Sequence, residues 1–397
     1  MKLSNKIEAC GLSPIRKFYP FAHKAEKRGL KIHHLNIGQP DIETPSAYFE
    51  AISAYRAEVL SYAPSGGVIA LIEAIQNYYA RLGVPYAPED ILITSGGSEA
   101  LSMAMLCILN EGDEVLVPEP FYPNYRTFIR MAGGEIRPIP TTPEDGYHYA
   151  DRSRIEPLIN EKTRALLITN PGNPTGAVLT QKEIRLLGDI AKEHDLYLIC
   201  DEVYREFIYD GGALTTAATL QDLAENLIIV DSVSKRFSAC GARVGALLSR
   251  NEALMEGAMK LAQSRLSVAT LDQVGAAALY RTKPSYFRAV RSEYQRRRDV
   301  CYEKLREIPG ILVSKPQGAF YMMAKLPVED TEAFQMFLLK NFDYEGETVM
   351  FAPGGGFYAT EGAGRSEVRI AYVHEISELE RSLEVLKKGL ETYNQKP

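Results

Sequence analysis

The chain has few cysteines, no excess of positive charge and no long apolar run. Its five cysteines (Cys10, Cys107, Cys200, Cys240 and Cys301) are scattered without a C-x-x-C pair, which argues against a disulfide framework or a zinc site. The net charge of −6 argues against a nucleic-acid partner, because such partners usually bind basic domains. No run is long enough to cross a bilayer, and the N-terminus lacks the apolar core of a signal peptide. We therefore expect a cytoplasmic protein without nucleic-acid, membrane or metal partners.

What the sequence does contain is typical of a globular enzyme. Of its 397 residues, 46% are hydrophobic and 24% are charged, which is sufficient for a large core and two joined domains. From about residue 68 to 250, helical patterns alternate with short apolar runs, which predicts an α/β fold with a mostly parallel sheet flanked by helices. The predicted strands are Ile91–Thr94, Glu114–Val117, Glu135–Pro140, Ala165–Ile168, Leu196–Cys200, Leu227–Val230 and Val244–Ser249.

The pattern changes after residue 250. A helix over about 285–307 leads to two short strands, Gly318–Ala324 and Glu367–Tyr372, and to a final amphipathic helix that Ser377 is expected to cap. These elements predict a smaller α+β domain. We expect residues 1–45 to form an N-terminal segment that packs with the small domain, 46–290 to form the large domain, and 291–397 to form the small domain.

Candidate functional side chains follow the predicted strands. Ligands of an open α/β sheet bind beyond the carboxyl ends of its strands, and Lys235 lies five residues after Val230. A lysine in a dry crevice loses its proton more readily and can form a Schiff base with an aldehyde. The Ser232 and Ser234 hydroxyls and the Arg243 guanidinium could hold a phosphate nearby. A lysine with phosphate anchors is what pyridoxal phosphate requires.

Other strand ends supply further polar groups. The turn containing Gly97 and Ser98 would bring backbone N–H groups to an anion, with Ser98 capping the helix that follows. Asn173, in a turn with two Asn-Pro steps, belongs either to a rigid structural turn or to a site where its amide donates to a ring hydroxyl. Asp201 is either a helix cap or the partner of a pyridine nitrogen that it keeps protonated. Because Asn173, Asp201 and Lys235 follow three successive strands, we favour one common site.

These motifs resemble those of the class I/II aminotransferases, which are fold-type I enzymes dependent on pyridoxal phosphate. The most specific motif is Ser-x-Ser-Lys-x-x-x-x-x-Gly-x-Arg-x-Gly over residues 232–245, which the chain matches at every position. Asn170-Pro-x-Asn-Pro-Thr-Gly176 and Asp201-Glu-Val-Tyr204 are further family motifs in the right order. The resemblance extends from about Gly11 to the C-terminus, and its overall pattern is similar to that of prokaryotic-type aspartate aminotransferases.

The resemblance implies a role in cofactor binding for each matching residue. Lys235 would form the Schiff base and carry the proton of the substrate α-carbon, while Asp201 would pair with the pyridine nitrogen. Asn173 and Tyr204 would donate to the ring 3′-oxygen, and Tyr122 would stack on the ring. The implied phosphate cradle comprises Gly97, Ser98, Ser232 and Arg243, together with Tyr62, which would reach the phosphate of the neighbouring subunit in a homodimer with shared active sites.

The resemblance also implies how the substrates bind. Arg369 would take the α-carboxylate, and the backbone of Gly38 would close over it. The predicted reaction is a ping-pong transfer of an amino group from an L-amino acid to a 2-oxo acid, with aspartate and 2-oxoglutarate as the expected pair. A dicarboxylate needs a second cation, for which Arg16 is the candidate, with an ordinary surface arginine as the alternative. Tyr122 stands where many aspartate-type members carry tryptophan, so this position does not identify the substrate.

Other functions remain open to different degrees. Similar aminotransferases act on alanine, aromatic or branched amino acids, and a carbon–sulfur β-lyase or a cyclopropane-forming synthase of the same fold would share Lys235, Asp201 and Arg369. A ligand-sensing domain of a transcription regulator would carry a winged-helix segment ahead of the resemblance, for which we expect no room before Gly11. A nicotinamide-dependent dehydrogenase would need G-x-G-x-x-G directly after a strand.

Overall fold

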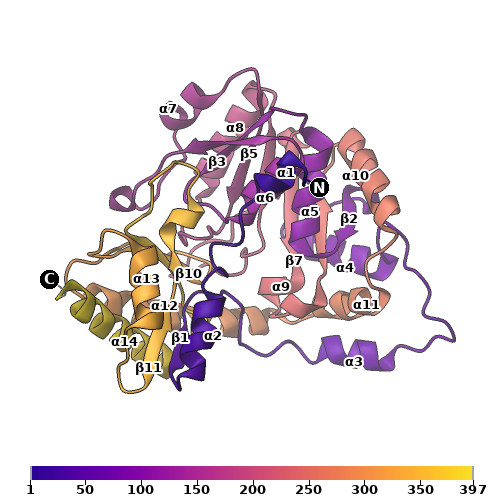
Figure 1. Ribbon diagram of the computed structural model, residues 1–397. Helices are drawn as coiled ribbons and strands as arrows, with labels where there is room; N and C mark the ends of the chain where they lie inside the picture. The colour runs from indigo at the N-terminus through magenta and orange to yellow at the C-terminus, as the bar shows by residue number, and fades with distance from the viewer. Residues whose placement is uncertain (1, 396–397) are drawn as a thin grey trace.

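The protein folds into two packed parts of unequal size (Figure 1). The structure is a computed structural model that describes residues 2–395. The larger part is an α/β unit with a central sheet, and the smaller part combines the C-terminal helices with short strands. The predicted α/β class, with a mostly parallel sheet and a smaller α+β part, is confirmed.

A seven-stranded sheet forms the centre of the larger part. Neighbouring strands are parallel except at β8, which is antiparallel to both β2 and β7. In spatial order the strands are β2 (Ile91–Thr94), β8 (Gly245–Leu248), β7 (Leu227–Ser232), β6 (Tyr197–Asp201), β5 (Thr163–Thr169), β3 (Glu114–Pro118) and β4 (Glu135–Ile139). Each strand predicted from the sequence is present. Because β5, β6 and β7 are parallel neighbours, the residues that follow them meet at one edge of the sheet.

Helices cover both faces of this sheet, which explains why its strands are apolar throughout. Along β7, Ile228 and Val230 belong to the core under α5, α6 and α10, whereas Leu227 and Ile229 belong to the core under α4, α8 and α11. This is the alternation that a strand imposes on successive side chains. The flanking helices are α4 (Ile69–Ala80), α5 (Gly96–Ile108), α6 (Asn124–Met131), α8 (Gln181–Glu193), α10 (Glu252–Arg265) and α11 (Thr270–Leu279).

The smaller part is built on a four-stranded antiparallel sheet. The N-terminal segment joins it, because β1 (Lys31–His34) pairs in parallel with β11 (Glu347–Met350). Its remaining elements are β12 (Ala352–Pro353), β13 (Glu367–Ala371), β10 (Tyr321–Lys325), β9 (Leu312–Val313), α2 (Tyr19–Lys27), α12 (Pro284–Arg306), α13 (Thr331–Lys340) and α14 (Ile376–Asn394).

Two connections bear on how the chain divides into domains. The short helix α1 (Asn5–Glu8) lies toward the larger part, because Nη1 of Arg130 in α6 donates to the Ala9 carbonyl at 2.8 Å. The helix α12 runs without a break through residue 290. The domain bounds at residues 45 and 290 stay predictions.

Side-chain contacts show how two helices begin. At the start of α8, the Thr180 hydroxyl accepts from the Glu183 backbone (3.2 Å) while the Glu183 carboxylate accepts from the Thr180 backbone (2.7 Å), which forms a reciprocal capping box. The prediction for Ser377 is wrong. The helix α14 begins at Ile376 with Glu375 at its N-cap position, two residues before the predicted cap, so Ser377 already has helical geometry and no side chain caps this end.

The described residues contain neither a membrane-crossing helix nor a metal cluster. Within residues 2–395, no helix combines the length and the apolar character that crossing a bilayer requires. No group of His, Cys, Asp and Glu side chains in this part of the chain could hold a metal ion.

Candidate active site

A cavity of about 590 Å³ lies beyond the ends of β6 and β7, where both parts of the protein and the segment after β1 contribute to its walls. Every site residue predicted from the sequence lines it, except Tyr62. These lining residues are Arg16, Gly38, Gly97, Ser98, Tyr122, Asn173, Asp201, Tyr204, Ser232, Ser234, Lys235, Arg243 and Arg369. Residues predicted from separate segments of the sequence thus meet in one cavity.

Lys235 lies in the single-turn helix α9 (Val233–Arg236), which follows β7 directly. Its amine donates to the Gly38 carbonyl at 2.9 Å and lies 3.7 Å from the Cys240 sulfur. It forms no ion pair with any described residue. The Gly38 backbone can approach only because it has no side chain, since a Cβ there would lie 1.9 Å from the Tyr321 hydroxyl. The lysine amine is thus held at the cavity wall without an acidic partner.

Asp201 ends β6 and is 6% exposed. Its Oδ2 accepts a hydrogen bond from the Tyr125 hydroxyl at 2.7 Å, and its Oδ1 accepts from the Val203 backbone at 3.3 Å. No cation among the described residues pairs with it. Burial raises the pKa of Asp201 to about 6, because a charged carboxylate is poorly solvated there. Such a carboxylate suits a ligand that brings an N–H group or a positive charge.

Two serines and an arginine form an anion site beside Lys235. The Ser232 hydroxyl donates to the Ser234 hydroxyl at 2.8 Å and holds it at the cavity. Arg243 adopts a left-handed backbone (φ 53°), and its guanidinium donates to the Cys240 carbonyl at 3.0 Å without an acidic partner among the described residues. An unpaired guanidinium with adjacent hydroxyls is suited to a phosphate group.

The first turn of α5 adds backbone N–H groups to this site. Gly97 and Ser98 lie within that turn and line the cavity, where helical N–H groups lack intrahelical acceptors and favour an anion. The prediction that Ser98 caps the helix is wrong. The helix begins at Gly96, so Ser95 occupies the N-cap position and Ser98 is already inside the first turn.

Polar side chains from both parts meet in the cavity that Lys235 lines. The Asn173 amide donates to the Tyr204 hydroxyl at 3.5 Å, and the Tyr204 and Tyr321 hydroxyls are 3.0 Å apart. Burial raises the pKa of Tyr204, so its hydroxyl stays protonated and can donate. Tyr122 lies edge-on to Tyr125, with ring centroids 5.5 Å apart.

Arg369 lies on β13 and is 2% exposed. Its Nη1 donates to the Asn173 side-chain oxygen at 3.1 Å, and its Nη2 donates to the Asn36 carbonyl at 2.7 Å. The guanidinium carbon lies 4.4 Å from the Tyr321 ring centroid and 5.0 Å from that of Phe357. No acidic residue in the described chain pairs with this buried cation. The site therefore offers a fixed guanidinium to an anionic ligand.

The two remaining predicted residues lie further from this centre. Arg16 is exposed at the cavity and forms no ion pair with the described residues. Tyr62 is 81% exposed and does not line the cavity of its own chain.

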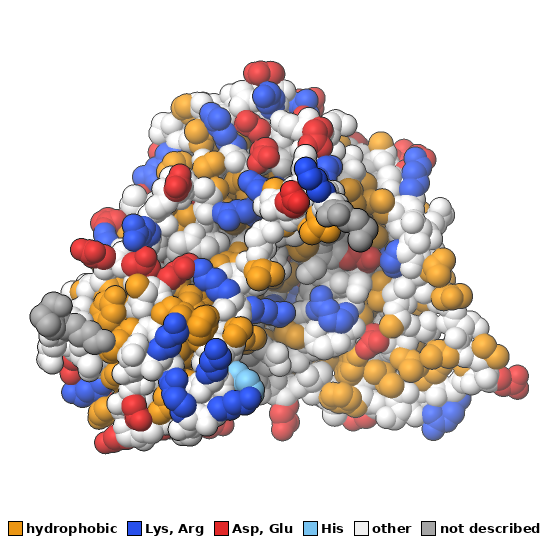
Figure 2. Space-filling view, in the orientation of Figure 1, with side chains coloured by type: hydrophobic (Ala, Val, Ile, Leu, Met, Phe, Trp, Pro, Cys, Tyr) orange, Lys and Arg blue, Asp and Glu red, His pale blue; other side chains and the backbone are white. Residues whose placement is uncertain are grey.

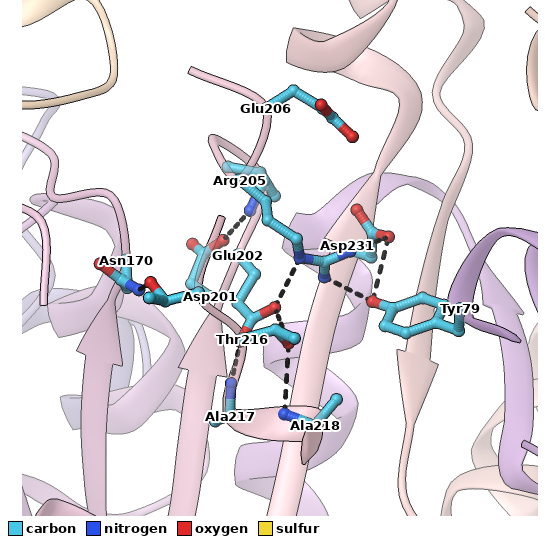
Figure 3. Close-up of polar contacts among 12 residues, drawn as sticks. Tyr79, Asn170, Asp201, Glu202, Arg205, Glu206, Thr216, Ala217, Ala218 and Asp231 are labelled. Atoms are coloured by element: carbon cyan, nitrogen blue, oxygen red, sulfur yellow. Dashed lines mark hydrogen bonds and ion pairs between the residues drawn. The ribbon is translucent and has the colours of Figure 1, made fainter. Parts of the chain in front are cut away.

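A buried network of charges supports the end of β7 and α9 (Figure 3). Asp231 is fully buried and accepts from Arg236 at 2.6 Å. Arg205 lies between Asp231 and Glu202, 3.7 Å from the first and 2.7 Å from the second, and donates to the Tyr79 hydroxyl at 2.5 Å. Because Arg236 follows Lys235 directly, these contacts fix the backbone that presents the lysine.

Some lining residues were not predicted from the sequence. Tyr125 orients Asp201, Tyr321 contacts Tyr204 and Arg369, and Asn36 lies beside Arg369. Tyr125 and Tyr321 look like ordinary core aromatics in the sequence, while Asn36 belongs to the irregular segment that also contains Gly38. The place of Asn36 within that segment was the only local signal.

Comparisons with known proteins agree with this geometry. The chain matches the family described as aminotransferase class I and II over residues 31–386. It is 33% identical to an aromatic-amino-acid aminotransferase of Thermococcus litoralis, with 98% of each chain covered, and 30% identical to an aspartate aminotransferase of Bacillus subtilis, with 99% of this chain and all of that one covered. Its structure resembles that of an alanine aminotransferase from Pyrococcus furiosus, with a TM-score of 0.90, 30% identity and coverage of 98% of this chain and 100% of that one. The chain therefore belongs to the class I and II aminotransferases, enzymes of fold type I.

Proposed function

We propose that this aminotransferase uses pyridoxal phosphate to move an amino group from an L-amino acid to a 2-oxo acid in a ping-pong reaction. One observation carries the proposal. The amine of Lys235, the buried carboxylate of Asp201 and the anion site at Arg243 share one cavity, and none of the three has an oppositely charged partner among the described residues. A cofactor with an aldehyde, a ring nitrogen and a phosphate matches all three.

Each of these groups would bind one part of the cofactor. Ser232, Ser234, Arg243 and the first turn of α5 would hold the phosphate, and Asp201 would pair with the ring nitrogen. Asn173 and Tyr204 would donate to the ring oxygen, and Tyr122 would lie against the ring. When bound, pyridoxal phosphate supplies an electron sink for the charge that develops at the substrate α-carbon.

The residues of the chain would carry the remaining chemistry. The Nζ atom of Lys235 would take the proton from the substrate α-carbon and would then donate it to the cofactor rather than back to that carbon. Arg369 binds the α-carboxylate and so fixes the direction of the C–H bond that breaks. The Gly38 carbonyl, which accepts from Lys235 in this structure, keeps the amine at the cavity wall.

Replacement of the lysine tests the proposal. Lys235→Ala should abolish turnover and the absorbance of the lysine-bound cofactor, whereas Lys260→Ala, at an exposed position on α10, should retain both. If the Lys235→Ala variant retains turnover and the absorbance band, Lys235 is not the anchor.

For the substrate, we propose aspartate with 2-oxoglutarate. Arg16 and Arg369 line the same cavity, and neither pairs with an acidic side chain of the described residues, which suits a ligand with two carboxylates. Arg16→Ala should lower the preference for aspartate over alanine, while Lys17→Ala, which removes the neighbouring cation that pairs with Glu332, should not. An unchanged preference in the Arg16→Ala variant would exclude this role.

Other substrates and a related reaction stay as alternatives. The Thermococcus litoralis relative is named for aromatic amino acids and the Pyrococcus furiosus structure for alanine. Half-reaction rates with a panel of amino acids distinguish these substrates from aspartate. Release of pyruvate and ammonia without any 2-oxo acid acceptor would instead indicate a carbon–sulfur lyase.

We also propose a homodimer with shared active sites, in which Tyr62 reaches the phosphate of the neighbouring subunit. The helix α3 (Ala47–Ala54) and the segment that follows it run along the outside of the protein (Figure 1), and hydrophobic side chains gather over this region of the surface (Figure 2). The exposed apolar residues of this region include Phe49, Val59, Leu60, Tyr62 and Ile69. Sedimentation should give twice the mass of the chain, and a monomer with full activity would contradict this proposal. A cytoplasmic location stays a prediction.

A further inference from the structure

Asn36 is a buried amide whose side chain has no hydrogen-bond partner. The residue is 0% exposed, and neither Oδ1 nor Nδ2 contacts a donor or acceptor within the described chain. Buried side-chain amides are nearly always paired, because an unpaired one loses its bonds to water without replacing them. A ligand or an ordered water must therefore complete the surroundings of this amide.

The position of Asn36 is fixed by the strands on either side of it. The preceding residue, Leu35, donates its backbone N–H to the Met350 carbonyl and accepts from the Ala371 N–H, both at 2.8 Å. The backbone carbonyl of Asn36 itself accepts from Arg369 Nη2 at 2.7 Å. Asn36 is also one of the residues that line the cavity, where it lies next to Arg369.

The charges around this amide indicate an anionic ligand. The Arg369 guanidinium contacts Asn36 through its backbone carbonyl and has an Nε that is also buried without a partner. Lys235 lines the same cavity. A cationic or apolar ligand would leave these donors unpaired. The NH2 end of an amide can donate two hydrogen bonds and can be turned toward an acceptor by a half rotation of the side chain.

We propose that the Asn36 side chain donates to the substrate carboxylate that Arg369 binds, so that Asn36 is a further substrate-binding residue. This inference rests on the proposed function, because it requires that Arg369 binds a carboxylate. The Asn36 side chain has no hydrogen-bond partner within the described residues, and the ligand would supply one.

Removal of the amide tests this role by separating binding from stability. Asn36→Leu keeps the size of the side chain and removes its polar atoms. In calorimetric titrations of the holoenzyme with maleate, a dicarboxylate that cannot react, the dissociation constant should rise about tenfold or more. The melting temperature without maleate should not fall, because no hydrogen bond within the protein is lost. Asn36→Ala, which needs no repacking, gives the same comparison if leucine is not accommodated.

A paired amide in the same part of the protein is the matched control. Gln335 is also 0% exposed, but its Nε2 donates to the Val349 carbonyl at 3.2 Å and its Oε1 accepts from the Phe351 backbone at 2.8 Å. Gln335→Leu should lower the melting temperature and leave maleate binding unchanged. A purely structural Asn36 would behave like Gln335.

Two further variants complete the test. Asn36→Asp keeps the shape but places a negative charge beside the carboxylate, so it should weaken maleate binding more than Asn36→Leu does. Unchanged maleate binding in Asn36→Leu, or in Asn36→Asp, would overturn the inference and indicate a water-filled site. Arg369→Leu separates this failure from that of the proposed function. If Arg369→Leu loses maleate binding and Asn36→Leu does not, only the role of Asn36 fails, whereas unchanged binding in Arg369→Leu removes the carboxylate site itself.

Discussion

Asp201 should make the protein without its cofactor less stable at neutral pH. The carboxylate is buried, and burial raises its pKa from the ordinary value of 3.8 to about 6. Between these two pH values the folded protein binds more protons at this group than the unfolded chain does, so the free energy of unfolding falls as the pH rises. A shift of this size corresponds to about 3 kcal/mol once the pH exceeds 6. Asp201→Asn removes the charge at nearly constant shape, so it should be more stable than the wild type by up to about 3 kcal/mol at pH 7 to 8.

The assay is urea unfolding of the protein stripped of cofactor, at several pH values between about 4 and 8. Circular dichroism is the suitable signal, since the chain contains no tryptophan. The wild type and the Asp201→Asn variant should be nearly equally stable near pH 4. The difference in their free energies of unfolding should grow as the pH rises to about 6 and then stay constant. Asp222 is a contrasting control: its hydrogen bond with Arg185 lowers its pKa to about 2, so Asp222→Asn should lose stability by an amount that is nearly constant over this pH range. A less stable Asp201→Asn variant, with a gap that does not depend on pH, would refute the reasoning.

With cofactor present, the wild type should be the more stable of the two proteins, because Asp201→Asn removes the partner of the ring nitrogen. The variant should then bind pyridoxal phosphate less tightly than the wild type, as measured by equilibrium titration of the stripped protein. This pair of results, a gain in stability without cofactor and a loss of affinity for it, distinguishes a carboxylate held for a ligand from one that stabilises the fold.

Three other substitutions have defined outcomes. Gly38→Ala should lower kcat/KM by at least about tenfold, because the new Cβ would lie 1.9 Å from the Tyr321 hydroxyl and displace the backbone; steady-state kinetics check this, and an unchanged kcat/KM contradicts it. Arg205→Ala should reduce the free energy of unfolding by about 3–5 kcal/mol, because it leaves buried Asp231 with one cation fewer. Urea denaturation measures this loss, and a loss below about 1 kcal/mol would show that the charges of the network are not coupled. Arg369→Leu should raise KM for the amino acid and the oxo acid by about two orders of magnitude while cofactor affinity stays the same, and equal KM values would exclude a carboxylate at this position.

The predictions from sequence succeeded where the signal is local. The strands of the large sheet are continuous apolar runs because both of their faces are covered, and the groups that follow β6 and β7 must reach one edge of a parallel sheet. Asp201 and Lys235 could therefore be placed together from the pattern of strands alone. Arg369, by contrast, could be assigned only by resemblance, since nothing in a five-residue strand indicates which distant cavity it faces.

The features that the sequence missed depend on packing between distant segments or on single-residue shifts. Tyr321 lies beside Arg369 because β10 pairs with β13, whereas Asn36 reaches Arg369 because β1 joins the small part through β11. Ser98 and Ser377 were assigned as helix caps, but each helix begins earlier than the pattern suggests, and a cap is lost by a shift of one or a few residues. No spacing rule connects Arg205 to Asp231, whose contact arises from the order of strands in the sheet.

The central claim is that Lys235 is the covalent anchor of pyridoxal phosphate. Borohydride reduction of the holoenzyme, followed by proteolysis and peptide mass spectrometry, locates the attachment directly. The expected result is a reduced pyridoxal phosphate group on the peptide that contains Lys235, and on no other lysine. An unmodified Lys235 peptide, or a group attached to a different lysine, would contradict the account.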